Sequence, residues 1–225
     1  EFYEAWAADF TIDGRAPRAG EIFKYKGMAE TLEELGRTNC ESFYRGAIAD
    51  AIDSYSRKTG GYLRKEDLAA YKAQWVEPIT TNYRGYDVWE IPPNGHGIVV
   101  LMALNILEGM DLSAGHDDPE TAHKIMEALK LAFTDGKRYV ADPRAMKPTV
   151  EQLLSRDYAK KRRALIGSTA LEPKPGTPYC GDTVYLNAAD GDGNMISYIQ
   201  SIYCGFGSGT VLPGTGIVFH NRGNN

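Results

Sequence analysis

A change in hydrophobic period near residue 182 constrains the fold of this chain more than any other feature. Before it, apolar residues recur at helical spacing over most of the chain. After it, the pattern is that of a hairpin, with strands expected over 183–189 and 195–203 around a turn at 190–194. A run of helices followed by a run of strands predicts an α+β chain.

The periodicity also predicts the individual elements. Helices are expected over 27–36, 41–58, 64–75, 98–109 and 118–142, and as two short pieces over 149–166. An extended stretch with a turn near Gly85 interrupts them over 82–91. Beyond the hairpin, a glycine-rich loop over 205–209 leads to a third expected strand over 216–220.

Composition excludes several classes of function. The 225 residues include 25 Lys and Arg against 30 Asp and Glu, so the net charge of -5 predicts no nucleic-acid partner. The four histidines show no paired ligand spacing, which argues against zinc. An EF-hand reading of Asp190-x-Asp192-x-Asn194 fails, because Met195 and Ser201 stand where such a loop needs Gly and Glu. We therefore predict no metal and no cofactor.

No targeting signal is visible in the sequence. No apolar run approaches the roughly 18 residues that a membrane span needs. No signal peptide can be recognised. The localisation therefore stays open between periplasmic or secreted and cytoplasmic.

Thr183, at the start of the first hairpin strand, is a candidate nucleophile. A threonine hydroxyl needs an adjacent base at neutral pH. Cleavage of the preceding bond would supply one, because the new α-amine has an unperturbed pKa near 8. The alternative is an ordinary loop-to-strand junction, where Thr is common.

A series of short motifs extends along the chain in an order that resembles a known family. They include Phe43-Tyr44-Arg45-Gly46, Gly60-Gly61-Tyr62-Leu63-Arg64-Lys65-Glu66-Asp67-Leu68, Tyr83-Arg84-Gly85-Tyr86, Ile91-Pro92-Pro93 with Gly97, and Leu104-Asn105-Ile106-Leu107-Glu108. After them come a Thr that opens a strand, Asp190-Gly191-Asp192-Gly193-Asn194, and a glycine-rich loop with a Pro-Gly turn. Together these motifs resemble the γ-glutamyltransferase family, also called γ-glutamyltranspeptidase or glutathione hydrolase.

The resemblance implies both a fold and a division of the chain. The fold would be the four-layer α-β-β-α sandwich of N-terminal nucleophile hydrolases, incomplete in this chain. Self-cleavage between Asp182 and Thr183 would separate 1–182, the mostly helical C-terminal part of a large subunit, from 183–225, the β-rich start of a small subunit. The two products would stay associated as a heterodimer.

The resemblance also implies a reaction. Thr183 would attack a small-molecule amide, typically the γ-glutamyl bond of glutathione-like compounds, and pass the acyl group to water or an amine. Ser201 matches the position whose hydroxyl supports the nucleophile. Its alternative role is a strand-end serine bonded to the backbone.

Three positions depart from the family's usual pattern. Tyr203 stands where an Asn helps to hold the glutamyl group, Arg222 where a Gln helps to bind its α-amine, and Val184 where a second Thr is usual. An arginine would repel the substrate's amine and suits a carboxylate better. The open alternatives are a related acylase on another amide, an uncleaved scaffold protein without catalysis and, for Arg222, an ordinary surface charge.

Overall fold

The chain folds into two compact units. The structure is a computed structural model that describes the backbone of residues 2–172 and 183–222. One unit combines 2–73 with 183–222, and the other comprises 74–172. Helices and antiparallel hairpins form separate segments of the chain, so the predicted α+β class is confirmed.

The first unit contains five short helices among its described residues. They are α1 (Phe2–Phe10), α2 (Lys26–Arg37), α3 (Glu41–Arg45), α4 (Ala47–Lys58) and α5 (Lys65–Ala70). The prediction of one helix over 41–58 is wrong, because Gly46 separates α3 from α4 with φ −115° and ψ −148°, outside the helical region. The expected helix over 64–75 stops early, since Tyr71 is already extended. The sequence pattern did not predict α1.

The core of this unit joins α4 to the C-terminal part of the chain. Ile48 and Ile52, four residues apart on one face of α4, pack with the buried Leu212. Partly buried apolar side chains surround them, including Leu35, Phe43, Tyr55, Leu63, Leu68, Ile217 and Phe219. The segment that follows the hairpin is therefore part of the core of the first unit.

The predicted hairpin is present as β3 (Thr183–Ala189) and β4 (Met195–Ser201). The second strand ends two residues earlier than expected, because Tyr203 adopts φ +81°. The third strand expected over 216–220 is wrong. Gly214 and Gly216 both have positive φ, and the chain there forms a tight turn with one isolated bridge between Val211 and Val218.

The second unit begins with a two-stranded hairpin of β1 (Ile79–Tyr83) and β2 (Tyr86–Glu90). Arg84 and Gly85 both have positive φ at its turn, as a two-residue type I′ connection requires. The helices α6 (Gly97–Leu107), α7 (Pro119–Tyr139), α8 (Val150–Leu153) and α9 (Arg156–Arg163) follow. Two short helices, α8 and α9, lie within 149–166, as predicted.

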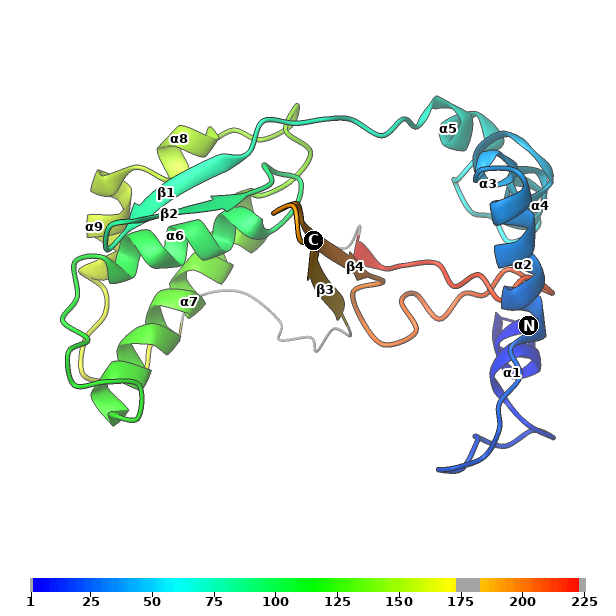
Figure 1. Cartoon of the computed structure of the whole chain (residues 1–225), viewed down its shortest axis with the longest axis horizontal. Coiled ribbons are helices and arrows are strands. Elements are labelled where there is room, and N and C mark those ends of the chain that lie inside the picture. The colour runs from blue at the N-terminus through cyan, green and yellow to red at the C-terminus, as the bar shows by residue number, and fades with distance from the viewer. Residues whose placement is uncertain (1, 173–182, 223–225) are drawn as a thin grey trace. The chain divides into compact units, whose positions relative to one another are not determined.

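α6 forms the centre of the second unit. Eight of its residues are buried, and it packs against α7, α9 and the β1–β2 hairpin (Figure 1). Asn105 of α6 connects β1 to the end of α8: its Oδ1 accepts a hydrogen bond from Thr81 and its amide donates to the carbonyl of Leu154. Over the described ranges, no helix has both the length and the apolar character that crossing a membrane requires.

Candidate functional site

The hairpin register brings Thr183 and Ser201 together. They are direct cross-strand partners at the open end of β3 and β4, while Ala189 pairs with Met195 at the closed end. Directly opposed residues in an antiparallel pair have Cα atoms about 4.5–5.5 Å apart. Asp182 and the Thr183 side chain lie outside what the structure describes, so both residues keep their roles as predictions.

The turn at 190–194 fixes this register. The Asp190 carboxylate accepts hydrogen bonds from the backbone N–H groups of Asp192 and Asn194, each at 3.0 Å, and from the Asn194 amide at 2.8 Å. These bonds, led by that from the Asn194 side chain, lower the pKa of Asp190. The Asp190 carboxylate, part of the pattern that suggested a calcium loop, thus has a structural role in the turn. Within the described ranges, no group of three or more His, Cys, Asp or Glu could hold a metal ion.

Ser201 ends β4 with its hydroxyl directed at the backbone. Its Oγ accepts a hydrogen bond from the N–H of Tyr203 at 3.0 Å. This bond matches the alternative role of a strand-end serine. The two roles are compatible, because a hydroxyl that accepts one bond also carries a hydrogen to donate. The acceptor bond orients this hydroxyl at the position opposite Thr183.

Tyr203 and Arg222, the two departures from the family pattern, contact each other. The Arg222 guanidinium carbon lies 5.3 Å from the centroid of the Tyr203 ring, within the range of a cation–π contact. Tyr203 adopts φ +81°, a left-handed conformation that costs a residue with a side chain about 1–3 kcal/mol. Positions that are 19 residues apart in sequence (222 − 203) therefore meet beside Ser201.

Sequence reasoning missed Asn221, which connects these two positions. Its side-chain oxygen accepts from the N–H of Cys204 at 3.1 Å, and its own N–H donates to the carbonyl of Ile202 at 3.2 Å. Its place next to Arg222 was the only available signal. Neither bond could be inferred without the left-handed backbone at Tyr203.

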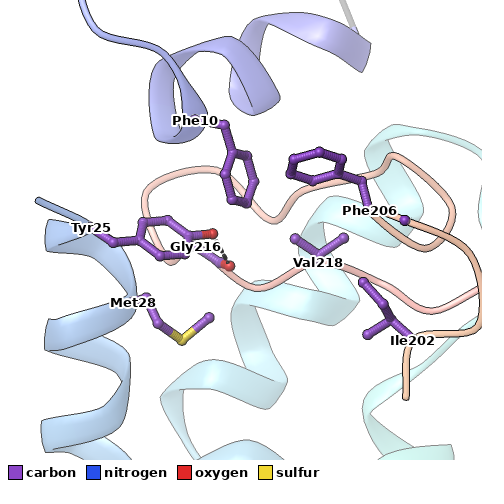
Figure 2. A pocket seen from close by; sticks show the side chains of 8 residues that line it. Phe10, Tyr25, Met28, Ile202, Phe206, Gly216 and Val218 are labelled. Atoms are coloured by element: carbon purple, nitrogen blue, oxygen red, sulfur yellow. Dashed lines mark hydrogen bonds between the residues drawn. The ribbon is translucent and has the colours of Figure 1, made fainter. Parts of the chain in front are cut away.

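A hollow of about 420 Å³ lies beside the segment that follows β4, and residues of that segment help to line it (Figure 2). Its lining is apolar and consists of Phe10, Tyr25, Met28, Ile202, Gly205, Phe206, Gly216 and Val218. The rings of Phe10 and Phe206 meet edge to face at 4.9 Å. Apolar side chains thus pack against the segment after β4, while polar contacts among Ser201, Tyr203, Cys204 and Asn221 hold its backbone.

Tyr25 supplies a polar contact at the edge of this hollow. Its hydroxyl donates to the carbonyl of Gly216 at 2.5 Å (Figure 2). Burial raises the pKa of Tyr25 to about 12, and the nearby Asp9 carboxylate contributes to the rise. The phenol is therefore protonated at neutral pH and acts as a donor to the segment that leads to Arg222.

Comparisons with known proteins give matches to one family over nearly the whole chain. The family model for gamma-glutamyltranspeptidase matches residues 2–225. The glutathione hydrolase-like YwrD proenzyme of Bacillus subtilis (strain 168) is 38% identical over 216 residues, 96% of this chain and 41% of that protein. The chain thus spans less than half the length of the curated relatives it matches.

Solved structures show the same relationship. The crystal structure of cephalosporin acylase from Bacillus halodurans is 56% identical with a TM-score of 0.88, covering 100% of this chain and 41% of that one. Helicobacter pylori gamma-glutamyltranspeptidase is 30% identical with a TM-score of 0.66, over 78% of this chain and 52% of that one. The predicted N-terminal nucleophile hydrolase fold, a four-layer α-β-β-α sandwich, is confirmed, and this chain contains part of it. The chain belongs to the gamma-glutamyltranspeptidase family.

Proposed function

We propose that the protein is a self-processing amide hydrolase and acyltransferase with Thr183 as its nucleophile. The observation that supports this most is the position of Thr183 as the first residue of β3, directly opposite Ser201, in a chain of this family. A residue that begins a strand has a fixed backbone, so both its hydroxyl and its future α-amine would be positioned against a substrate.

The proposed cleavage uses the same hydroxyl as the later reaction. The Thr183 oxygen attacks the Asp182 carbonyl carbon, the Asp182–Thr183 peptide bond breaks, and the acyl group moves from nitrogen to oxygen. Water hydrolyses the resulting ester, which releases Asp182 as a carboxylate and leaves Thr183 with a free α-amine. Residues 1–182 and 183–225 would then belong to a large and a small subunit that remain associated.

The proposed reaction cleaves an amide substrate in two steps. The α-amine of Thr183 takes the hydroxyl proton while the oxygen attacks the amide carbonyl. The carbon–nitrogen bond breaks, the leaving amine takes the proton, and the acyl group stays on Thr183 as an ester. Water or a second amine then accepts the acyl group. Ser201 donates a hydrogen bond that orients the nucleophile, and the substrate of first choice is a γ-glutamyl amide of the glutathione type.

Denaturing gel electrophoresis of the purified full-length protein tests the cleavage. We expect two fragments from the wild type, with the smaller one beginning at Thr183 by mass spectrometry. Thr183→Ala should give one uncut chain, and Thr183→Ser, which keeps a hydroxyl, should cut more slowly. A single band from the wild type, unchanged by Thr183→Ala, would instead support an uncleaved scaffold protein.

The contact between Tyr203 and Arg222 favours a second candidate substrate, an acyl group that carries a carboxylate and no α-amine. Arg222 would repel the cationic amine of a γ-glutamyl group and would pair with a carboxylate. The similar Bacillus halodurans protein is named a cephalosporin acylase, which supports an acylase role for this chain. A glutaryl amide is the simplest such substrate, since it is a γ-glutamyl amide without the amine.

Release of p-nitroaniline separates the two candidates. We expect faster release from glutaryl-p-nitroanilide than from γ-glutamyl-p-nitroanilide. Arg222→Gln should reverse that preference by lowering kcat/KM for the glutaryl compound about tenfold or more, because a hydrogen bond to a charged group contributes about 1.5–3 kcal/mol. A wild-type preference for the γ-glutamyl compound would favour the first candidate.

A further inference from the structure

The peptide groups on both sides of Tyr203 are held by hydrogen bonds. The group between Ile202 and Tyr203 uses its carbonyl as an acceptor from the Asn221 N–H and its N–H as a donor to Ser201. The group between Tyr203 and Cys204 donates its N–H to the Asn221 side chain. The left-handed conformation of Tyr203 is thus fixed from both sides, and Asn221 takes part on each side.

Asn221 is itself held by a well-bonded segment. Two residues earlier, the Phe219 carbonyl accepts from the N–H of Ser208 at 2.8 Å and from its hydroxyl at 2.9 Å. The Phe219 N–H donates to the Thr210 carbonyl at 3.0 Å. The backbone that carries Asn221 is therefore anchored to the glycine-rich loop, so its amide reaches Cys204 from a fixed position.

The same segment places Arg222. Arg222 directly follows Asn221, and its guanidinium lies over the Tyr203 ring whose backbone Asn221 holds. Ile202 and Val218, which belong to the same two chain segments, face the apolar hollow and lie near Phe206 (Figure 2). The apolar contacts support the two chain segments, and among the described contacts Asn221 connects one to the other next to the ring through both its backbone N–H and its side chain.

We propose that Asn221 is a positioning residue that sets Tyr203 and Arg222 for a carboxylate on the acyl group. Its side-chain oxygen fixes the peptide after Tyr203, which fixes the ring, and the ring orients the guanidinium above it. Asn221 does not touch the substrate in this arrangement. The inference rests on the proposed function, in its form with a carboxylate-bearing acyl group.

A double-mutant cycle on the full-length protein tests this role. The variants are Asn221→Ala, Arg222→Ala and the double variant, with Asn187→Ala, an exposed asparagine on β3, as the matched control. KM and kcat are measured with glutaryl-p-nitroanilide, and the Kd for free glutarate is measured by calorimetry. The cycle isolates the coupling between the two positions.

If Asn221 acts through Arg222, Asn221→Ala raises KM and the glutarate Kd about tenfold, as expected for loss of a well-placed charged contact. The double variant then binds glutarate within about threefold of Arg222→Ala alone, because the effects are coupled. A purely structural role predicts a lower kcat from less folded protein, with unchanged KM and Kd. That result, or fully additive effects, would overturn the proposal.

The glutarate measurement also separates this proposal from the proposed function. If the wild type releases no p-nitroaniline from either compound, the proposed function fails while glutarate binding still tests Asn221. Binding that Asn221→Ala weakens supports the positioning role, and equal binding by both proteins overturns it. A wild type that binds no glutarate overturns the carboxylate-reading role of the pair.

Discussion

At the scale of single residues, Gly207 shows how close the backbones beside the site approach. Its φ is +54°, and a Cβ added there would lie 2.4 Å from the Phe219 carbonyl oxygen and 3.0 Å from the His220 Cα. That carbonyl already accepts both hydrogen bonds from Ser208. Glycine is therefore required at 207 both for its backbone conformation and for space.

Gly207→Ala should lower the free energy of unfolding more than Gly209→Ala does. Gly209 has a similar positive φ of +73° but nothing within 4 Å of its Cβ position, so it isolates the conformational cost. We expect about 1 kcal/mol at Gly209 and a further 1–3 kcal/mol at Gly207 from overpacking. Urea unfolding of both variants gives the comparison. Equal losses would show that the Phe219 segment moves away without cost.

The sequence named Thr183, Ser201, Tyr203 and Arg222 as candidate site residues but predicted no contact between Tyr203 and Arg222. The observed register, counted back from the five-residue turn, pairs Thr183 with Ser201. The contact between Tyr203 and Arg222 depends on a left-handed residue and on the path of a long loop, which no periodicity encodes. Asn221 was missed for the same reason.

At the scale of elements, α2 and the turn at 213–216 are joined by several specific contacts. The Tyr25 hydroxyl donates to the Gly216 carbonyl, and the Thr31 hydroxyl donates to the Thr215 carbonyl at 2.7 Å. A Cβ on Gly27 would lie 3.1 Å from the Gly214 carbonyl oxygen, so the helix and the turn are in close contact. The N-cap and N-terminal half of α2 thus hold the chain a few residues before Asn221.

Tyr25→Phe should lower the free energy of unfolding by about 1–3 kcal/mol, because the buried Gly216 carbonyl loses its donor. Tyr62→Phe is the control, since Tyr62 is 95% exposed and should change stability by less than about 0.5 kcal/mol. Urea titration monitored by circular dichroism measures both. A Tyr25→Phe variant as stable as Tyr62→Phe would mean that water replaces the phenol at no cost.

Elements with a strong period were predicted well, and short ones poorly. α7, β2 and the turn before β2 lie close to their expected ranges, because an amphipathic stripe or a two-residue turn defines them locally. β1 begins at Ile79, three residues before the expected stretch. The strand expected over 216–220 was wrong because a short apolar run next to glycines fits a turn equally well. α1 was missed for lack of a clear stripe over its nine residues.

At the scale of the whole molecule, the β3–β4 hairpin presents apolar side chains on both faces. The exposed positions alternate along the strands and include Val184, Tyr185, Ile196 and Ile199. Strands that are apolar on both faces are typical of sheets covered on both sides, as in a layered sandwich. The α+β class could be predicted from the sequence, because the spacing of apolar residues indicates the order of helices and strands. That spacing does not indicate how the layers pack on one another.

The two units have separate cores, and that of the second includes a buried ion pair. Asp135 of α7 and Arg162 of α9 lie 2.9 Å apart, with side chains 7% and 20% exposed. The two facing atoms, Asp135 Oδ2 and Arg162 Nε, do not form a well-directed hydrogen bond. Burial therefore outweighs the attraction to Arg162 and raises the pKa of Asp135 above its ordinary value of 3.8.

The raised pKa of Asp135 predicts how stability depends on pH. Well below pH 3.8 the carboxyl is protonated in both the folded and the unfolded chain. The contribution of the raised pKa to the free energy of unfolding is therefore fully present there. As pH rises toward the folded pKa, the unfolded chain loses the proton first, and stability falls by up to about 1.4 kcal/mol per pH unit. Asp135→Asn removes this dependence. The stability of the variant relative to the wild type should therefore rise with pH through this window and then level off.

Urea unfolding at a series of pH values from about 3.5 to 7 measures that difference, with Asp192→Asn as the control because Asp192 is exposed. Asp135→Asn also leaves Arg162 without its ion-pair partner. This adds a constant to the difference in the free energy of unfolding at every pH in this range, since arginine stays charged. Only the slope of the difference therefore reports on the carboxyl. A flat difference would mean that the attraction to Arg162 cancels the effect of burial. A falling difference would mean that the attraction outweighs burial, so that the ion pair stabilises the contact between α7 and α9 in its charged form.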